Sequence, residues 1–150
     1  MKTILISFIF LLSGASSALA DVVTKCDVPQ GYSYYFPSLV VPNKKAGWVQ
    51  DGVTNGSYLV TRDADRQYDV IFTDAVDRTR SSREDGGKII VLSESDNQLV
   101  LVVAYPEKNV ETWYFKINPS GAGEVTVSQA RYGRDQVINK HSLMRAICSR

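Results

Sequence analysis

The chain has 150 residues, 44% of them hydrophobic, and its 17 lysine and arginine residues nearly balance 16 aspartate and glutamate residues. A chain of this length predicts one domain that can bury its own core. The near-zero net charge argues against binding of nucleic acid, which needs a basic surface, and gives no support for an anionic-membrane binder.

The first 20 residues have the composition of a secretory signal peptide. Lys2 supplies the positive start, an apolar run follows it, and Ala18-Leu19-Ala20 matches an A-x-A cleavage site. The apolar run is shorter than the roughly 20 residues that a membrane span requires. We therefore predict a signal peptide over residues 1–20, cleaved after Ala20, and a periplasmic or secreted protein with no membrane span. An uncleaved anchor is the alternative.

The only two cysteines, Cys26 and Cys148, lie near opposite ends of the remaining chain. In an exported protein, two cysteines most simply form one structural disulfide. The Cys-x-x-Cys spacing of a redox-active pair is absent. We predict a bridge that joins the two ends of a single β domain over residues 21–150.

The N-terminal part of this domain has an irregular pattern. Residues 31–36 are aromatic and β-prone. Residues 37–42 begin and end with proline, which predicts an edge strand or a packed extended segment. Residues 47–56 predict a loop that Trp48 anchors.

The rest of the domain alternates apolar and polar residues in short segments that turn-forming residues separate. In chain order, these segments are residues 57–62, 67–75, 88–93, 98–105, 110–117, 124–132 and 141–148. Short strands at this spacing predict an all-β fold, an antiparallel meander of about eight strands that is barrel-like or a sandwich.

One predicted strand is apolar on both faces, from Leu99 to Ala104. An antiparallel strand with one face in water normally alternates, so something should cover its second face. The expected cover is the aromatic segment 32–41. A partner surface, including a second copy in a homodimer, is the alternative.

Two groups of residues are candidates for binding. Arg78, Arg80 and Arg83 lie in a charged loop over residues 76–87. Loops on a rigid sheet often carry binding residues, and arginine suits carboxylate or phosphate recognition; a solvated loop is the alternative. An aromatic pocket is the second candidate, with core packing as the alternative. Its residues would be Tyr34, Tyr35, Trp48 and Trp113.

No pattern in the chain predicts catalysis, a metal or a cofactor. His141 is the only histidine, which excludes sites that need two, and the adjacent Ser142 would point to the opposite face of a strand. Asp63, Asp65 and Asp69 lack the spacing of a calcium loop, and we interpret residues 63–66 as a hairpin turn. Whether any two acidic residues form a catalytic pair cannot be judged from sequence.

These features predict an exported, non-catalytic binding module of the bacterial periplasm or exterior. It would engage a protein or a small ligand through loops at one end of the β domain. Size, signal, cysteine positions and β content are similar to small secreted lysozyme inhibitors, families that insert a Ser-Gly loop into the enzyme's cleft. Ser120-Gly121 lies in a suitable turn, but the tyrosine that usually follows is missing. The alternatives are a secreted inhibitor of a lysozyme-type hydrolase, an envelope assembly or structural protein, and a small carboxylate-based hydrolase.

Overall fold

The computed structural model describes residues 20–120, 122–133 and 136–149. In these residues there is a short 3-10 helix, η1 (Asn43–Lys45), and no α-helix. All other regular structure is β-strand. The strands are β1 (Asp21–Tyr35), β2 (Gly47–Gly52), β3 (Ser57–Arg62), β4 (Tyr68–Thr73), β5 (Thr79–Ser81), β6 (Lys88–Ser95), β7 (Gln98–Tyr105), β8 (Asn109–Ile117), β9 (Gly123–Arg131) and β10 (Lys140–Ser149).

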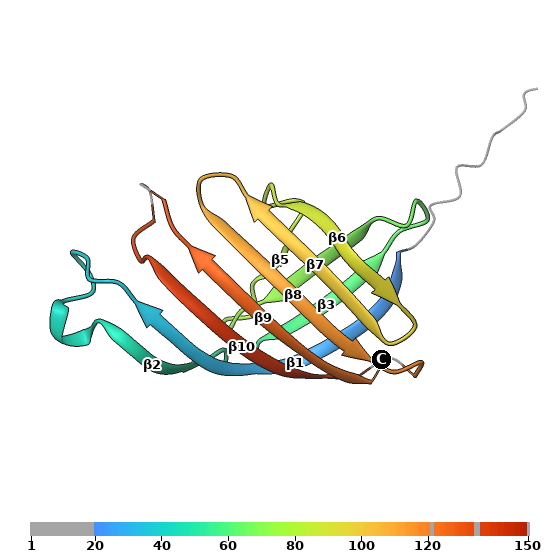
Figure 1. The fold of residues 1–150 in the computed structure, drawn as a ribbon, viewed down its shortest axis with the longest axis horizontal. Helices are drawn as coiled ribbons and strands as arrows, with labels where there is room; N and C mark the ends of the chain where they lie inside the picture. The colour runs from blue at the N-terminus through green and yellow to red at the C-terminus, as the bar shows by residue number, and fades with distance from the viewer. Residues whose placement is uncertain (1–19, 121, 134–135, 150) are drawn as a thin grey trace, which may run out of the picture.

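The strands form one antiparallel sheet in the order β5-β4-β3-β1-β10-β9-β8-β7-β6, and β2 pairs with β1 outside this path. The sheet is strongly curled, so that β3 to β5 lie behind β7 and β8 and face them across the hollow side (Figure 1). The all-β prediction is confirmed. Of the two predicted architectures the structure is the barrel-like one, because one curled sheet supplies both walls of the core.

The long first strand, β1, organises this curl. Val28 has a positive φ of 53° and Pro29 has no backbone N–H, so the ladder between β1 and β10 breaks there in a bulge. Before the bulge, β1 pairs with β3; after it, the same edge of β1 pairs with β2. The second half of β1 therefore lies between β2 and β10, with which it stays paired as far as Tyr35.

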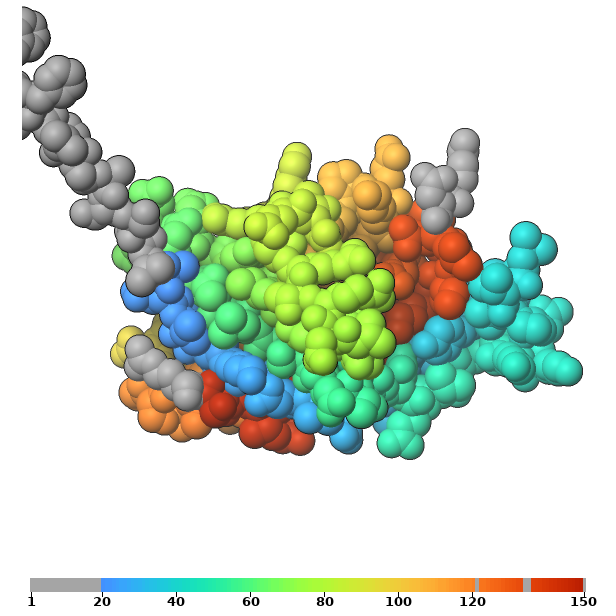
Figure 2. Space-filling view, turned by 180° about the vertical axis from the view of Figure 1, so that it is seen from behind, coloured from blue at the N-terminus to red at the C-terminus, as the bar shows by residue number. Residues whose placement is uncertain are grey.

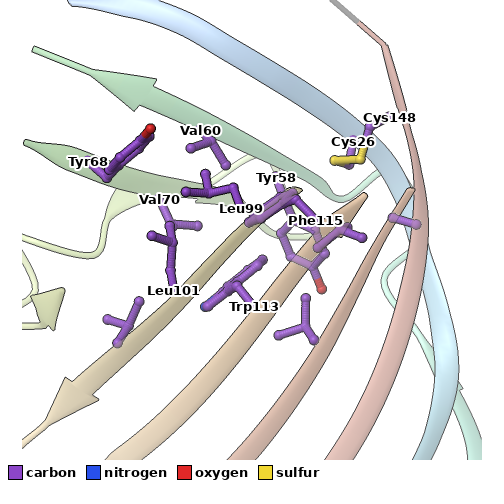
Figure 3. Close-up of a cluster of buried hydrophobic side chains, with 14 residues drawn as sticks. Cys26, Tyr58, Val60, Tyr68, Val70, Leu99, Leu101, Trp113, Phe115 and Cys148 are labelled. Atoms are coloured by element: carbon purple, nitrogen blue, oxygen red, sulfur yellow. A yellow bond between two sulfur atoms is a disulfide. The ribbon is translucent and has the colours of Figure 1, made fainter. Parts of the chain in front are cut away.

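Cys26 on β1 and Cys148 on β10 are directly opposite in the ladder and form a disulfide. Their side chains are buried at the closed end of the curled sheet (Figure 3). The predicted bridge between the near-terminal segments is confirmed.

The core lies on the hollow face, where every second residue of each strand points inward. Phe115, Leu101, Val60 and Val70 are fully buried there. The rings of Trp113 and Phe115 stack with their centroids 6.0 Å apart, and the ring of Tyr58 meets Trp113 edge-on at 4.7 Å. Figure 3 shows these side chains converging from both walls of the sheet.

The segment between β4 and β6 closes the open side of the curled sheet. In the view from behind, this yellow-green segment lies across the middle of the molecule (Figure 2). A Cβ on Gly87 would come within 2.9 Å of the side chains of Tyr105 and Val103, so the segment lies directly against β7. Farther along the same opening, an ion pair of 3.0 Å joins Arg62 on β3 to Glu94 on β6.

Three local predictions were wrong. Residues 47–52 form strand β2 because β1 offers them a free edge, which their own mixed pattern does not reveal. Residues 37–42 form neither an edge strand nor a packed extended segment, because residues 39–41 bend and Leu39 and Val40 are exposed. The charged loop over residues 76–87 contains the short strand β5, which pairs with β4.

The expected cover of β7 was also wrong. The core cluster that packs on β7 contains residues of β3 and β4 and none from 32–41. Leu99, Leu101 and Val103 point into the core, and Val100, Val102 and Ala104 are half-buried on the outer face. A homodimer through this strand stays a prediction.

The predicted signal peptide lies outside the described residues except for Ala20. Among the residues that are described, no helix has both the length and the apolar character needed to cross a membrane.

Candidate ligand-binding cavity

The inner face of the sheet becomes more polar from one end to the other, in rows that run across the strands. A floor row is apolar and consists of Leu101, Trp113, Val127 and Met144. The middle row consists of Val103, Glu111, Gln129, Ser142 and Ser33. The rim row consists of Tyr105, Asn109, Arg131, Lys140 and Tyr35. Since the register aligns these positions, polar side chains from five strands gather at one end of the hollow face.

A cavity of about 560 Å³ occupies this end. Its floor includes Trp113, Met144 and, from the opposite wall, Tyr58 and Phe72. Its mouth is charged and includes Arg78, Arg80, Lys108, Arg131, Lys140, Asp74 and Asp85. The volume falls within the 300–1,000 Å³ that is typical of small-molecule sites.

Glu111 is the most unusual residue of the cavity, because its carboxylate is only 8% exposed. One oxygen, Oε1, accepts hydrogen bonds from Asn109 Nδ2 at 2.7 Å and Gln129 Nε2 at 2.9 Å. The other, Oε2, accepts the indole N–H of Trp113 at 3.0 Å. Burial raises the pKa of Glu111 above its ordinary value of 4.5, and these hydrogen bonds oppose the rise only in part.

A second carboxylate, that of the half-buried Asp51 on β2, lies beside the middle row and joins residues of β1 and β10. Its Oδ2 accepts hydrogen bonds from Ser33 at 2.6 Å, Lys140 at 3.0 Å and Tyr35 at 3.1 Å. Burial acts to raise the pKa of Asp51, but the hydrogen bonds from Ser33 and Lys140 and the lysine charge together hold the pKa below its usual value. Ser33 also shares a hydrogen bond of 2.8 Å with Ser142, so the network reaches β10.

The cations at the mouth differ in whether they are paired. Arg78 pairs with Asp74 at 3.0 Å, Arg80 with Asp85 at 3.6 Å, and Lys140 with Asp51. Lys108 and Arg131 form no ion pair with any described residue. These two cations are therefore available to a ligand.

Asn109 contributes an unused acceptor to the same rim. Its amide nitrogen is bound to Glu111, while its Oδ1 is buried and has no hydrogen-bond partner among the described residues. A buried polar atom without a partner costs about 1–3 kcal/mol. This cost arises because Asn109 orients its amide nitrogen toward Glu111.

Two tyrosines line the cavity with their phenols held in the neutral form. Burial, reinforced by the negative charge of Glu111, raises the pKa of Tyr105 to about 12. The same two causes raise the pKa of Tyr58 well above its usual value. Both side chains therefore carry an O–H group at neutral pH.

The three arginines of the predicted binding loop differ in whether they line the cavity. Arg78 and Arg80 line the cavity mouth and Arg83 does not. The guanidinium of Arg83 binds Asp63 at 3.2 Å and Gln67 at 3.3 Å, and so ties the loop to the turn after β3.

The four residues of the predicted aromatic pocket do not line one pocket. Trp113 lies in the cavity floor, and Tyr35 lies in the rim row, where its hydroxyl binds Asp51. Tyr34 and Trp48 lie on the outer face, with their rings edge-to-face at 5.5 Å.

Sequence reasoning missed Glu111, Gln129, Lys108 and Arg131. A signal for the first two was present, because strand alternation places Glu111 on the same face as Trp113 and Phe115, and Gln129 on the face of Val125 and Val127. A charged residue in phase with core residues is a sign of a functional or paired group. Lys108 and Arg131 carry no such signal, since they come from a turn and a strand end.

The remaining candidates lie away from the cavity. His141 is exposed on the outer face, where its ring meets Phe36 at 5.6 Å. The hydroxyl of Ser120 donates to the side chain of Asn118 at 2.6 Å, in the turn between β8 and β9 at the opposite end from the cavity mouth; Gly121 lies outside the described residues. Among the residues that are described, no three His, Cys, Asp or Glu side chains are grouped to hold a metal ion.

Comparisons with known proteins leave the function open. No protein-family model, no curated protein and no solved structure matches the chain.

Proposed function

We propose that this protein is an exported, non-catalytic binding protein of the bacterial periplasm or exterior that takes a small organic anion into the open end of its curled sheet. The observation that carries the proposal is the ordered change across the rows of the hollow face, from an apolar floor to a cationic rim. The disulfide suits an oxidising compartment outside the cytoplasm.

The chemistry of the lining defines the class of ligand. An apolar or aromatic part would lie against Trp113 and Met144 in the floor. A carboxylate, sulfonate or phosphate would bind Arg131 and Lys108 at the rim, because charged hydrogen bonds of this kind are strong and specific.

Native mass spectrometry of the protein purified from the exported fraction of its host is the first test. We expect a bridged species that carries an added small mass, and denaturation should release that mass. The same spectrum reports the cleavage point and the oligomeric state.

Binding of the aromatic sulfonate 8-anilinonaphthalene-1-sulfonate tests the cavity directly. In a Trp48→Phe background, Trp113 is the remaining tryptophan, and energy transfer from it reports bound dye; variants of the cavity mouth then report whether that dye lies in the cavity. We expect Arg131→Gln and Lys108→Gln each to weaken binding about tenfold or more, since a hydrogen bond to a charged group contributes about 1.5–3 kcal/mol.

Arg83→Gln is the matched control, because Arg83 lies in the same charged surface but outside the cavity. It should leave dye affinity unchanged. The proposal is wrong if the folded protein shows no energy transfer to the dye, or if the Arg131 and Lys108 variants bind it as the unaltered protein does.

A further inference from the structure

The hairpin of β1 and β2 extends beyond the rest of the sheet and ends in the loop over residues 36–46, which we name the hairpin tip. It is the cyan projection at one end of the molecule in Figures 1 and 2. None of the proposed ligand-binding residues at the rim belongs to this loop, so its role is independent of the proposed function.

A tight turn holds two apolar side chains out at the tip. The backbone N–H of Ser38 donates to the carbonyl of Val41 at 2.9 Å, and the N–H of Val41 donates to the Ser38 hydroxyl at 3.1 Å. Between these anchors, Leu39 is fully exposed and Val40 is 55% exposed. Exposed turns usually carry Gly, Asn, Asp or Ser at such positions, so the folding of the turn does not explain Leu-Val there.

Aromatic side chains form a collar behind the tip on the outer face. The ring of Tyr34 meets Phe36 edge-on at 5.1 Å and Trp48 at 5.5 Å. Trp48 is 66% exposed and Phe36 is 40% exposed. Tryptophan and tyrosine in this arrangement are typical of surfaces that lie at the boundary between water and lipid.

The charge around the tip has one sign. Lys44 and Lys45 are exposed in η1, and no acidic residue occurs from position 28 to position 50. In a chain whose total charge is near zero, the hairpin tip is therefore a local cationic surface. The near-equal totals of acidic and basic residues, which gave no support for binding to an anionic membrane, do not reveal this local positive charge.

We infer that the hairpin tip docks the protein onto a bilayer surface that contains anionic lipid. Leu39 and Val40 would enter the headgroup region, Trp48 would lie at its boundary, and the two lysines would bind lipid phosphates. A second copy fits the tip less well. A symmetric pair would bring Lys44 and Lys45 near their own copies, and a stable dimer buries about 800 Å² per partner, more than a narrow turn offers.

Vesicle binding tests this inference, with Trp48 as a built-in probe because Trp113 is 3% exposed and shielded in the core. The purified protein is mixed with vesicles of phosphatidylcholine containing about one-third phosphatidylglycerol, a fraction high enough to give a strongly negative surface. We expect it to float with the vesicles and its Trp48 emission to shift to shorter wavelength. Leu39→Ser should weaken partition about tenfold or more, from the lost burial of one leucine.

Lys44→Gln with Lys45→Gln should weaken partition about 30-fold on the anionic vesicles, since each lysine contributes about 1 kcal/mol there. The same pair should have no effect on vesicles of phosphatidylcholine alone. Val76→Ser is the matched control, because Val76 is also an exposed apolar loop residue, 67% exposed, on another part of the molecule, and it should leave partition unchanged.

Two results would overturn the inference. One is folded protein that stays unbound on both kinds of vesicle with unchanged Trp48 emission. The other is a concentration-dependent dimer in the absence of lipid that Leu39→Ser abolishes, which would assign the tip to a second copy.

Discussion

Replacing Glu111 with glutamine should remove a pH-dependent loss of stability from the folded protein, although glutamine cannot accept all three of the hydrogen bonds that the carboxylate accepts. Burial outweighs those hydrogen bonds and raises the pKa of Glu111 in the folded state above 4.5. The folded protein therefore binds this proton more tightly than the unfolded chain does. As pH rises from about 4.5 through the folded-state pKa, the free energy of unfolding falls.

Glutamine has nearly the shape of the protonated glutamate side chain and does not ionise. The free energy of unfolding of the variant therefore lacks the decrease with rising pH that ionisation of Glu111 causes. The difference in unfolding free energy between variant and unaltered protein should be smallest near pH 4. It should grow by up to about 1.4 kcal/mol for each pH unit and become constant above the folded-state pKa of Glu111. The other titrating groups are common to both proteins, so their contributions cancel in the difference.

Urea unfolding of both proteins between about pH 4 and pH 8 measures this difference. The reasoning would be refuted by a difference that does not change with pH. It would also be refuted by a difference that shrinks as pH rises, because the hydrogen bonds from Asn109, Gln129 and Trp113 would then outweigh the cost of burial.

Two further predictions concern the frame of the fold. Replacing Cys26 and Cys148 with alanine removes a bridge between residues with a sequence separation of 122. Because the unfolded chain then gains entropy, the free energy of unfolding should fall by about 5 kcal/mol. Urea unfolding measures this change, and an unchanged midpoint would contradict the prediction. Gly31→Ala places a methyl group against the backbone carbonyl of Leu143 on β10. It should lower the free energy of unfolding by about 1–3 kcal/mol, measured by thermal unfolding. Unchanged stability would mean that β1 and β10 can move apart at this point.

The Glu111 prediction also bears on function. A buried carboxylate that lowers stability at neutral pH is not explained by folding alone, and natural proteins retain such groups mainly at functional sites. Glu111→Gln should therefore separate the effect of this carboxylate on stability from its effect on ligand binding. The variant removes the charge and keeps a side chain of nearly the same size in the cavity.

The sequence was sufficient to predict the position of strands that pair with the next strand along the chain. Residues 57–62 and 98–105 were predicted with the bounds that β3 and β7 have, because alternation and turn residues are local properties. The disulfide between Cys26 and Cys148 followed from their number and compartment. The inward direction of Glu111 was also contained in the strand period, although it was not used.

Tertiary structure decided which strands meet over long distances. β1 takes β10, β3 and β2 as partners, and the bulge at Val28 and Pro29 divides one of its edges between two of them. No local pattern specifies such pairings, because a strand edge offers the same backbone groups to any partner. For this reason β2 was predicted as a loop.

The candidate site depended on the same long-range register. Polar residues from five strands form a cavity rim only because the ladders align them in rows, and Arg83 differs from Arg80 only because of where the loop folds back. The charge of the hairpin tip was likewise invisible in a balanced total. Composition records how many charges a chain has, whereas binding depends on which of them share a surface.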